Sequence, residues 1–177
     1  MDGTERQLRD LIDRDAIWQV MVRLARGLDR RDRDLVLSCY HDDAIDDHHV
    51  FIGTAASFVD WALDFAERTG VAYHHILSNH CCELDGDDAH AETYYTFSGI
   101  NLTPPHSLSF GRYIDHFQRR NGEWRIANRV CVMEGRLEVP TGSIPAALGV
   151  PLPATFDKTD LSYMRPVAPR QPATTDG

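Results

Sequence analysis

The sequence predicts an α+β fold, in which N-terminal helices wrap a cone-shaped, curved antiparallel sheet around a pocket. Apolar residues recur at helical spacing before Gly70, whereas the later segments alternate at the period of β-strands. Two dipeptides typical of tight hairpins, Asp85-Gly86 and Asn121-Gly122, separate strand-like segments. Because the helices come first and the strands follow, we expect the helices on one face of the sheet. The length of 177 residues suits one domain with its own core.

Three helices are expected in the first part of the chain. Their apolar residues return every three or four positions, which gives each helix one apolar face. Thr4 and Gln7 have the spacing of a capping box at the first helix, and Gly70 ends the third. The predicted bounds are 4–32, 33–40 and 55–68 for the helices, with a turn or short strand over 41–51.

Four long strands are expected in the second part of the chain. Their predicted bounds are 73–84, 90–102, 108–119 and 123–138. The Thr103-Pro104-Pro105 segment interrupts the pattern between the second and third strands, because proline cannot donate to a strand ladder. A curved sheet covered by helices encloses a cavity, and a small ligand would bind there.

Residues 140–177 form a proline-rich arm that follows the cone of residues 1–139. Seven of the nine prolines lie in the arm: Pro140, Pro145, Pro151, Pro153, Pro166, Pro169 and Pro172. A regular element throughout is therefore excluded, although a short helix near Ile144–Leu148 is compatible with the sequence. We expect the rest of the arm to be partly extended and to fray after Pro166.

The composition narrows the classes of partner. A net charge of -9 argues against nucleic acid and against an anionic membrane surface, both of which need an excess of Lys and Arg. A small hydrophobic substrate is the partner that this charge disfavours least. The N-terminus has no apolar signal segment, and no apolar run reaches the roughly 20 residues that span a bilayer, so a cytoplasmic protein is expected. The four cysteines contain no C-x-x-C pair and are expected to be reduced thiols, with no structural zinc.

A histidine in the first predicted strand and an aspartate near the end of the first helix are candidates for chemistry. Strand alternation places His75 and Asn79 on one face, and His74 and His80 on the other. A slip of the register by one residue would exchange these faces. Asp29 lies where a carboxylate opposes the helix macrodipole unless a partner holds it. It could accept a hydrogen bond from a histidine, or pair with a neighbouring arginine at the surface.

Residues 40–49 are rich in Asp and His, which raises the question of a metal site. Histidine and carboxylate ligands bind iron or zinc only when they converge, and density in the sequence does not show convergence. A solvated loop explains the same composition, and no metal is assigned. A third interpretation places the segment at the pocket mouth, where Asp47 or His48 would touch a substrate.

Four blocks in order carry a resemblance to a known family. They are RDAIWQVMVRLARGLDRRD, SCYHDDAIDD, YHHILSNHCCELDGDDAHAETY and GRYIDHFQRRNGEWRIANRV. The chain from Arg6 to Gly135 resembles the SnoaL-like branch of the nuclear-transport-factor-like superfamily, which includes scytalone dehydratase, bile-acid dehydratase and lindane dehydrochlorinase. The resemblance implies the cone-shaped fold and a reaction that uses no metal or organic cofactor.

The resemblance also implies roles for particular residues. Asp29 matches the helix aspartate of the family, and His75 its catalytic strand histidine, with Asn79 in an H-x-x-x-N arrangement. Arg129 falls where the dehydrochlorinase has a pocket arginine. In such relatives the His–Asp pair takes a proton from carbon and a leaving group departs.

One family feature is missing, namely the Tyr or Lys about one turn before the helix aspartate. That region reads Val22-Arg23-Leu24-Ala25-Arg26. Another residue must therefore assist the leaving group. The candidates are Arg26, Tyr40, Tyr113 and Arg129.

The leading prediction is a cofactor-independent lyase acting on a small hydrophobic catabolite, either aromatic or polycyclic. His75 is the predicted base and Asp29 its partner, and the reaction is a dehydratase-like elimination or a retro-aldol cleavage. The predicted substrate-binding residues are Tyr40, His48, Asn79, Tyr113 and Arg129. One alternative is a non-catalytic protein, either the small subunit of a ring-hydroxylating dioxygenase or a hydrophobic-ligand-binding protein. A second alternative is a ketosteroid-isomerase-like isomerase. A homodimer or homotrimer is expected in each case.

Overall fold

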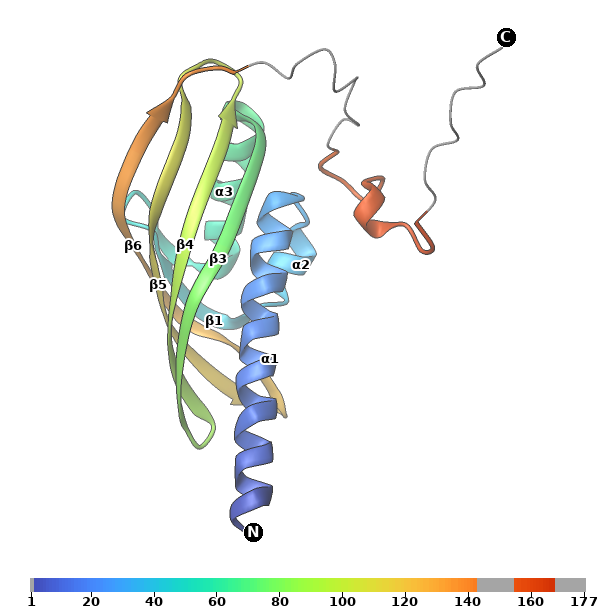
Figure 1. Cartoon of the computed structure of the whole chain (residues 1–177), viewed down its shortest axis with the longest axis vertical. Helices are drawn as coiled ribbons and strands as arrows, with labels where there is room; N and C mark the ends of the chain where they lie inside the picture. Colours follow the sequence, from blue (N-terminus) through green and yellow to red (C-terminus); the bar gives the residue numbers. More distant parts are fainter. Residues whose placement is uncertain (1, 143–154, 168–177) are drawn as a thin grey trace.

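The computed structural model describes residues 2–142 and 155–167 (Figure 1). Its elements are α1 (Gly3–Asp29), α2 (Arg33–Leu37), β1 (Tyr40–Asp47), β2 (Ile52–Thr54), α3 (Ala55–Thr69), β3 (Gly70–Asp85), β4 (Asp88–Asn101), β5 (His106–Arg120), β6 (Glu123–Val139) and a 3-10 turn at Leu161–Tyr163. The predicted α+β class is confirmed, and each long strand begins and ends close to its predicted bounds. The helix considered near Ile144–Leu148 lies outside the described residues.

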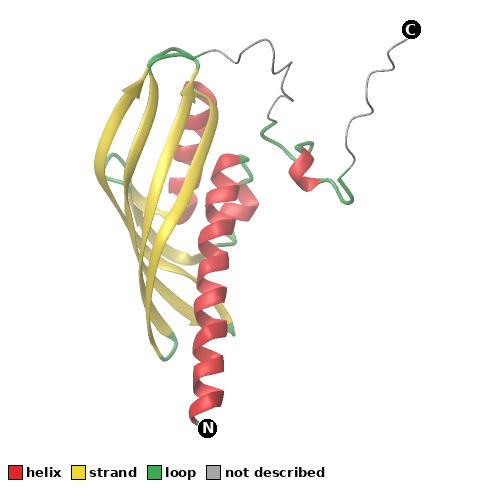
Figure 2. Ribbon diagram, in the orientation of Figure 1, coloured by secondary structure: helices red, strands yellow, loops and turns green. Residues whose placement is uncertain are grey.

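The strands form one curved, open sheet in the order β2-β1-β6-β5-β4-β3 (Figure 2). The four long strands pair antiparallel, as tight hairpins between consecutive strands require. The pairing of β1 with β6 is parallel, which the long connection between these strands allows. Helix α1 packs along β3 and β6, and α3 packs against β1 and β3.

A different residue pair from the predicted one caps helix α1. The Asp2 carboxylate accepts a hydrogen bond from the Glu5 backbone N–H at 2.9 Å, and the Glu5 carboxylate accepts one from the Asp2 N–H at 3.1 Å. This reciprocal arrangement is a capping box. The prediction of Thr4 and Gln7 was wrong because the helix begins one residue earlier, at Gly3.

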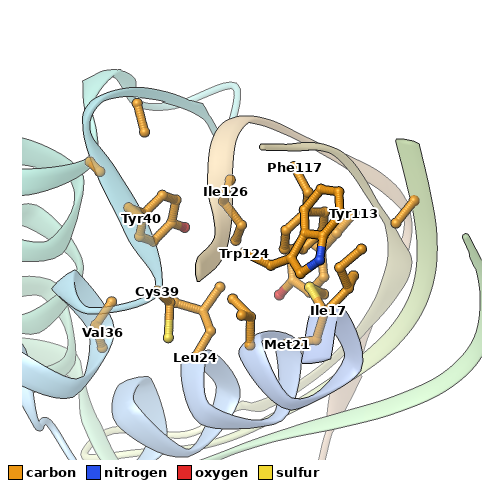
Figure 3. Packing of buried hydrophobic residues seen from close by; sticks show 14 of the residues in the cluster. Ile17, Met21, Leu24, Val36, Cys39, Tyr40, Tyr113, Phe117, Trp124 and Ile126 are labelled. Carbon is orange, nitrogen blue, oxygen red and sulfur yellow. The ribbon is translucent and has the colours of Figure 1, made fainter. Parts of the chain in front are cut away.

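The core lies between α1 and the lower half of the sheet. Ile17, Met21 and Leu24 occupy one face of α1 and are at most 1% exposed. They pack towards Phe117 and Ile126 on β5 and β6, both fully buried (Figure 3). Each such side chain contributes about 2 kcal/mol of burial free energy. This packing closes one end of the molecule.

A β-bulge in β3 decides which histidines face inward. Leu77 pairs with Tyr95 and His80 with Thr93, so the step from one pair to the next takes three residues in β3 and two in β4. The extra residue reverses the alternation. His80 is therefore half-buried, whereas Asn79 is exposed. The prediction that Asn79 shares the inner face with His75 was wrong, because it assumed an uninterrupted strand.

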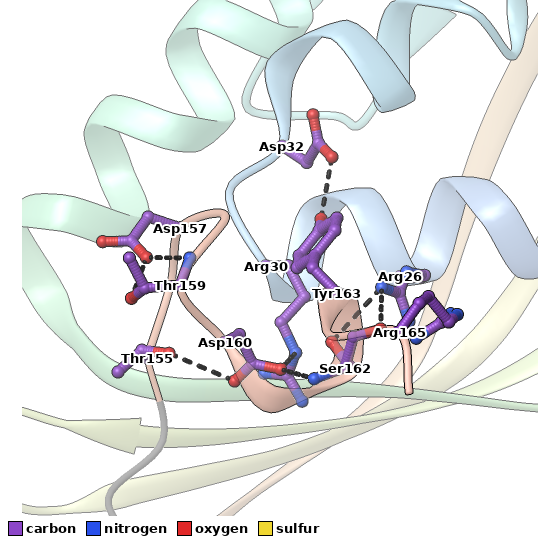
Figure 4. A network of polar contacts seen from close by, with 10 residues as sticks. All are labelled: Arg26, Arg30, Asp32, Thr155, Asp157, Thr159, Asp160, Ser162, Tyr163 and Arg165. Carbon is purple, nitrogen blue, oxygen red and sulfur yellow. Dashed lines mark hydrogen bonds and ion pairs between the residues drawn. The ribbon is translucent and has the colours of Figure 1, made fainter. Parts of the chain in front are cut away.

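The described part of the arm, residues 155–167, contacts the end of α1 (Figure 4). Arg26 donates to the backbone oxygen and hydroxyl of Ser162, both at 3.2 Å. The Tyr163 hydroxyl donates to Asp32 at 2.7 Å, and Arg30 lies 3.6 Å from Asp160. These contacts hold the segment beside the turn that follows α1. Among the described residues, none of the helices is both long and apolar enough to span a membrane.

Candidate active site

A cavity of about 710 Å³ lies between the inner face of the sheet and helix α3. Seven aromatic side chains contribute to its wall: Phe58, Trp61, Phe65, Tyr73, Tyr95, Phe97 and Tyr113. A concave, mainly apolar space of this volume suits one small organic molecule.

His75 of β3 reaches the cavity and is held by Asp29, the last residue of α1. The His75 Nδ1 atom lies 2.6 Å from Asp29 Oδ1. The backbone N–H of His75 also donates to both Asp29 oxygens at 3.1 Å. An ionised carboxylate only accepts hydrogen bonds, so Nδ1 carries the hydrogen and Nε2 is left as the acceptor. The predicted pair is thus assembled by the fold.

Asp29 lies at a helix C-terminus, where the macrodipole disfavours a carboxylate. The three contacts with His75 offset this cost. The competing interpretation, a surface ion pair with an arginine, does not hold. Arg30 contacts Asp160 and Arg33 contacts Asp60 instead.

A second histidine–aspartate pair faces the same cavity. His48 lines the cavity, and its Nδ1 hydrogen-bonds Asp46 Oδ1. Asp46 is fully buried, and its other oxygen accepts the Tyr40 hydroxyl at 2.7 Å. The His48 ring stacks on Phe58 with centroids 4.4 Å apart. His48 and Tyr40 were predicted separately as substrate-binding residues, and their link through Asp46 was not predicted.

The environment of His48 favours its charged form. Burial by itself lowers the pKa of this imidazole, but the hydrogen bond and charge of Asp46, together with the Cys131 side chain, outweigh it and raise the pKa to about 9. His48 is therefore an imidazolium at neutral pH. It presents a proton donor to the cavity.

Arg129 does not reach the large cavity. Its guanidinium is 2% exposed and donates to both oxygens of Asp115, at 2.7 and 2.8 Å. Burial disfavours its charge, but Asp115 raises the pKa of Arg129 well above the ordinary value. The guanidinium stacks 4.1 Å from the Tyr113 ring and borders only a void of about 10 Å³ beside His75. The expectation of a free pocket arginine is corrected, because Asp115 balances its charge.

Of the other predicted residues, Tyr113 lines the cavity, whereas Tyr40 and Arg26 do not. Tyr113 lines the cavity and stacks on Tyr95 at 4.6 Å. Tyr40 is 2% exposed and does not border the cavity. Its hydroxyl donates a hydrogen bond to Asp46. Arg26 is turned away towards the C-terminal segment. His48 is thus better placed than Tyr40, Arg26 or Arg129 to assist a leaving group.

Metal ligation does not explain the Asp/His-rich segment. Within residues 2–142 and 155–167, no cluster of three or more His, Cys, Asp or Glu side chains is arranged to hold a metal ion. Asp46 and His48 are used in the hydrogen-bonded pair described above, and Asp43 pairs with Arg120 at the surface.

Residues 9–130 match the SnoaL-like domain family, which accounts for well over half of the chain. The chain belongs to the SnoaL-like family. No curated protein matches the sequence.

Solved structures of other proteins share this SnoaL-like fold. A hexachlorocyclohexane dehydrochlorinase, LinA-type3 from Novosphingobium barchaimii, is 20% identical with a TM-score of 0.68, covering 78% of this chain and 99% of that one. A candidate scytalone dehydratase from Novosphingobium aromaticivorans is 17% identical with a TM-score of 0.67, covering 76% of this chain and 97% of that one. At such identities the similarity shows the fold, and the resemblance read from the sequence is confirmed.

Proposed function

We infer that this SnoaL-like protein is a cofactor-independent lyase that takes a proton from a carbon of a small hydrophobic molecule and expels a leaving group. The observation that carries the proposal is the 2.6 Å contact between His75 and Asp29 at the wall of the cavity. A scaffold or binding protein has no need of a histidine at the cavity wall that is oriented by a dedicated carboxylate.

His75 acts as the general base. Asp29 fixes the imidazole with its Nδ1 hydrogen bonded, so that the Nε2 lone pair can accept a proton. When the imidazolium forms, the adjacent carboxylate stabilises its charge. The apolar wall, including Phe97 at 5.0 Å from the His75 ring, keeps this interaction strong by excluding water.

His48 acts as the general acid towards the leaving group. In an elimination of water, His75 takes the proton as the C–H bond breaks, and the electron pair forms the new C=C bond. The C–O bond breaks at the same time, and the hydroxyl accepts a proton from His48 and departs as water. Asp46 keeps His48 charged for this step, and Tyr40 keeps Asp46 in place.

One further observation favours catalysis over simple binding, and a second favours elimination over isomerisation. The cavity holds two differently supported histidines, as an acid and a base require. The similar structures include proteins named as a dehydrochlorinase and a candidate dehydratase, and both names denote eliminations.

The proposal includes self-association into a homodimer or homotrimer. Its support is the outer face of the sheet, where large apolar side chains are exposed: Ile76, Tyr94, Phe110, Ile114 and Val130. Light scattering should give a multiple of the 20.0 kDa chain mass, and a monomer at micromolar concentration would contradict this part.

The test of the proposed function is a screen of hydroxylated aromatic and alicyclic compounds for the ultraviolet absorbance of a new conjugated double bond. His75→Ala should lose about 10³-fold in kcat for any active compound. His74→Ala is the matched control, because its side chain is exposed and adjacent in sequence. Equal rates for wild type and His75→Ala would refute the proposal, and tight binding without turnover would favour the ligand-binding alternative.

A further inference from the structure

The charge of the large cavity is opposite to that of the protein. The chain has 27 Asp and Glu residues against 18 Lys and Arg. Yet the described residues that border the cavity include no Asp or Glu. The basic ones among them are His48, His49, Arg68, His75 and Arg136. Such an inversion of charge raises the local concentration of anions and guides them to the site.

Arg136 faces the cavity because of a bulge in β6. Phe110 pairs with Gly135 and Gly111 with Met133, so Glu134 is the extra residue. The bulge reverses the alternation and turns Arg136 to the inner face, where it borders the cavity opposite Ser109. A regular strand would have pointed Arg136 outward.

The two carboxylates nearest to Arg136 in sequence are Glu134 and Glu138, and in the described residues neither forms an ion pair with it. Glu134 accepts a hydrogen bond from Arg112 at 2.7 Å on the other side of the sheet. In the described parts of the chain, no ion pair involves Arg136. Arg68 at the same cavity pairs only with Asp64, and both side chains are more than 60% exposed, so that pair is weak.

Arg136 also lies in register with the proposed base. His75 pairs with Phe97, Phe97 with Ser109, and Ser109 with Arg136. Three strand spacings separate the two ends of this row, or about 14 Å between backbones. Both side chains border the cavity, where His75 is half-buried and Arg136 is exposed, and the span between them has room for a ring and a short chain above Phe97.

We propose that the ligand of this cavity is a carboxylate-bearing molecule with an aromatic or alicyclic ring, whose ring contacts Phe97 while its carboxylate binds Arg136. A guanidinium binds a carboxylate through two parallel hydrogen bonds, which neither an amide nor an alcohol can reproduce. The anchored carboxylate places the carbons next to the ring beside His75. The inference rests on the proposed function only in taking this cavity as the substrate site.

The test compares two probes of the same shape, 3-phenylpropanoate and 3-phenylpropanamide, by isothermal titration calorimetry at low ionic strength. The wild type should bind the carboxylate about tenfold more tightly than the amide. Arg136→Gln should abolish this preference while leaving the affinity for the amide unchanged. Arg125→Gln is the control, because it removes the same charge at the far end of β6 and should keep the preference.

Three results would overturn the inference. They are equal affinity of the wild type for both probes, absence of binding by either, and an equal loss of preference in Arg125→Gln. Binding is measured without turnover, so the proposed function is tested separately. His75→Ala should keep the carboxylate preference even though it loses catalysis. If the wild type shows this preference but converts no compound, the inference about the ligand stands and the lyase proposal fails.

Discussion

The two histidine–aspartate pairs of the cavity have the same hydrogen bond, between histidine Nδ1 and an aspartate oxygen, but they lie in different surroundings. Asp29 ends a helix, is 16% exposed at its side chain, and binds only His75. Asp46 lies within a strand, is fully buried, and accepts a second hydrogen bond from Tyr40. We propose that the same residue types form a base at one wall and hold a charged acid at the other. The surroundings of the carboxylate, more than the histidine itself, separate the two roles.

The largest expected effect comes from removing the charge of the first carboxylate. Asp29→Asn should lower kcat about 10³-fold, because the amide no longer stabilises the imidazolium or fixes the imidazole tautomer. Steady-state kinetics on an active compound, with circular dichroism to verify the fold, checks this. A loss of less than threefold would mean that Asp29 only supports the backbone of His75.

The second pair should make stability depend on alkaline pH. The folded pKa of His48, about 9, exceeds its unfolded value of 6.5. This contribution is therefore fully present below about pH 6.5 and is lost as the pH rises through about 9. It amounts to about 3 kcal/mol at most. Urea unfolding should show the wild type weakening over this range.

Asp46→Asn should remove that pH dependence, because the raised pKa of His48 depends on the carboxylate. Asp47→Asn is its control, since Asp47 accepts a hydrogen bond from the backbone of His49 and not from His48. Parallel losses of stability in the wild type and Asp46→Asn between pH 7 and pH 9.5 would refute the link between Asp46 and the pKa of His48.

A smaller effect is expected from removing the acid itself. His48→Gln should lower kcat about 10²-fold, the low end for general acid catalysis, since the glutamine amide can still donate a hydrogen bond to the leaving group. The wild-type profile of kcat/KM should fall above about pH 9, where His48 loses its proton. This alkaline limb should be absent in His48→Gln. Its persistence there would assign the limb to another group.

The smallest expected effect concerns the support of Asp46. Tyr40→Phe removes one donor from a buried carboxylate and should cost about 1–2 kcal/mol of unfolding free energy. Tyr94→Phe is the control, because Tyr94 is 40% exposed on the outer face. Equal stabilities of the two variants would show that the Tyr40 hydroxyl contributes nothing to holding Asp46.

Much of the fold could be predicted, because it depends on local signals. Helical spacing before Gly70 and the dipeptides Asp85-Gly86 and Asn121-Gly122 mark the elements, and each dipeptide is found at a hairpin turn with its glycine at positive φ. His75 and Asp29 were predicted from the family resemblance, and the fold brings them together. The residues alone left both of them ambiguous.

The features that were not predicted depend on strand register. A prediction from alternating side chains assumes that the register is regular. One bulge moved Asn79 out of the inner face, and another brought Arg136 into it. No glycine marks the bulge in β3, whereas Gly135 at the bulge in β6 is a sequence signal that strict alternation overlooked. The partnership of Asp46 with His48 is different, because residues two apart in a strand share a face and could have been linked from the sequence.

The most direct test of the account is whether both histidines contact one bound molecule. The imidazole NMR signals of His48, His74 and His75, assigned with His→Gln variants, would be followed during titration with 3-phenylpropanoate. The signals of His48 and His75 should shift together with one dissociation constant, while that of His74 on the outer face stays in place. A shift of only one of the two inner signals, or separate dissociation constants for them, would contradict the claim that the two pairs serve a single cavity.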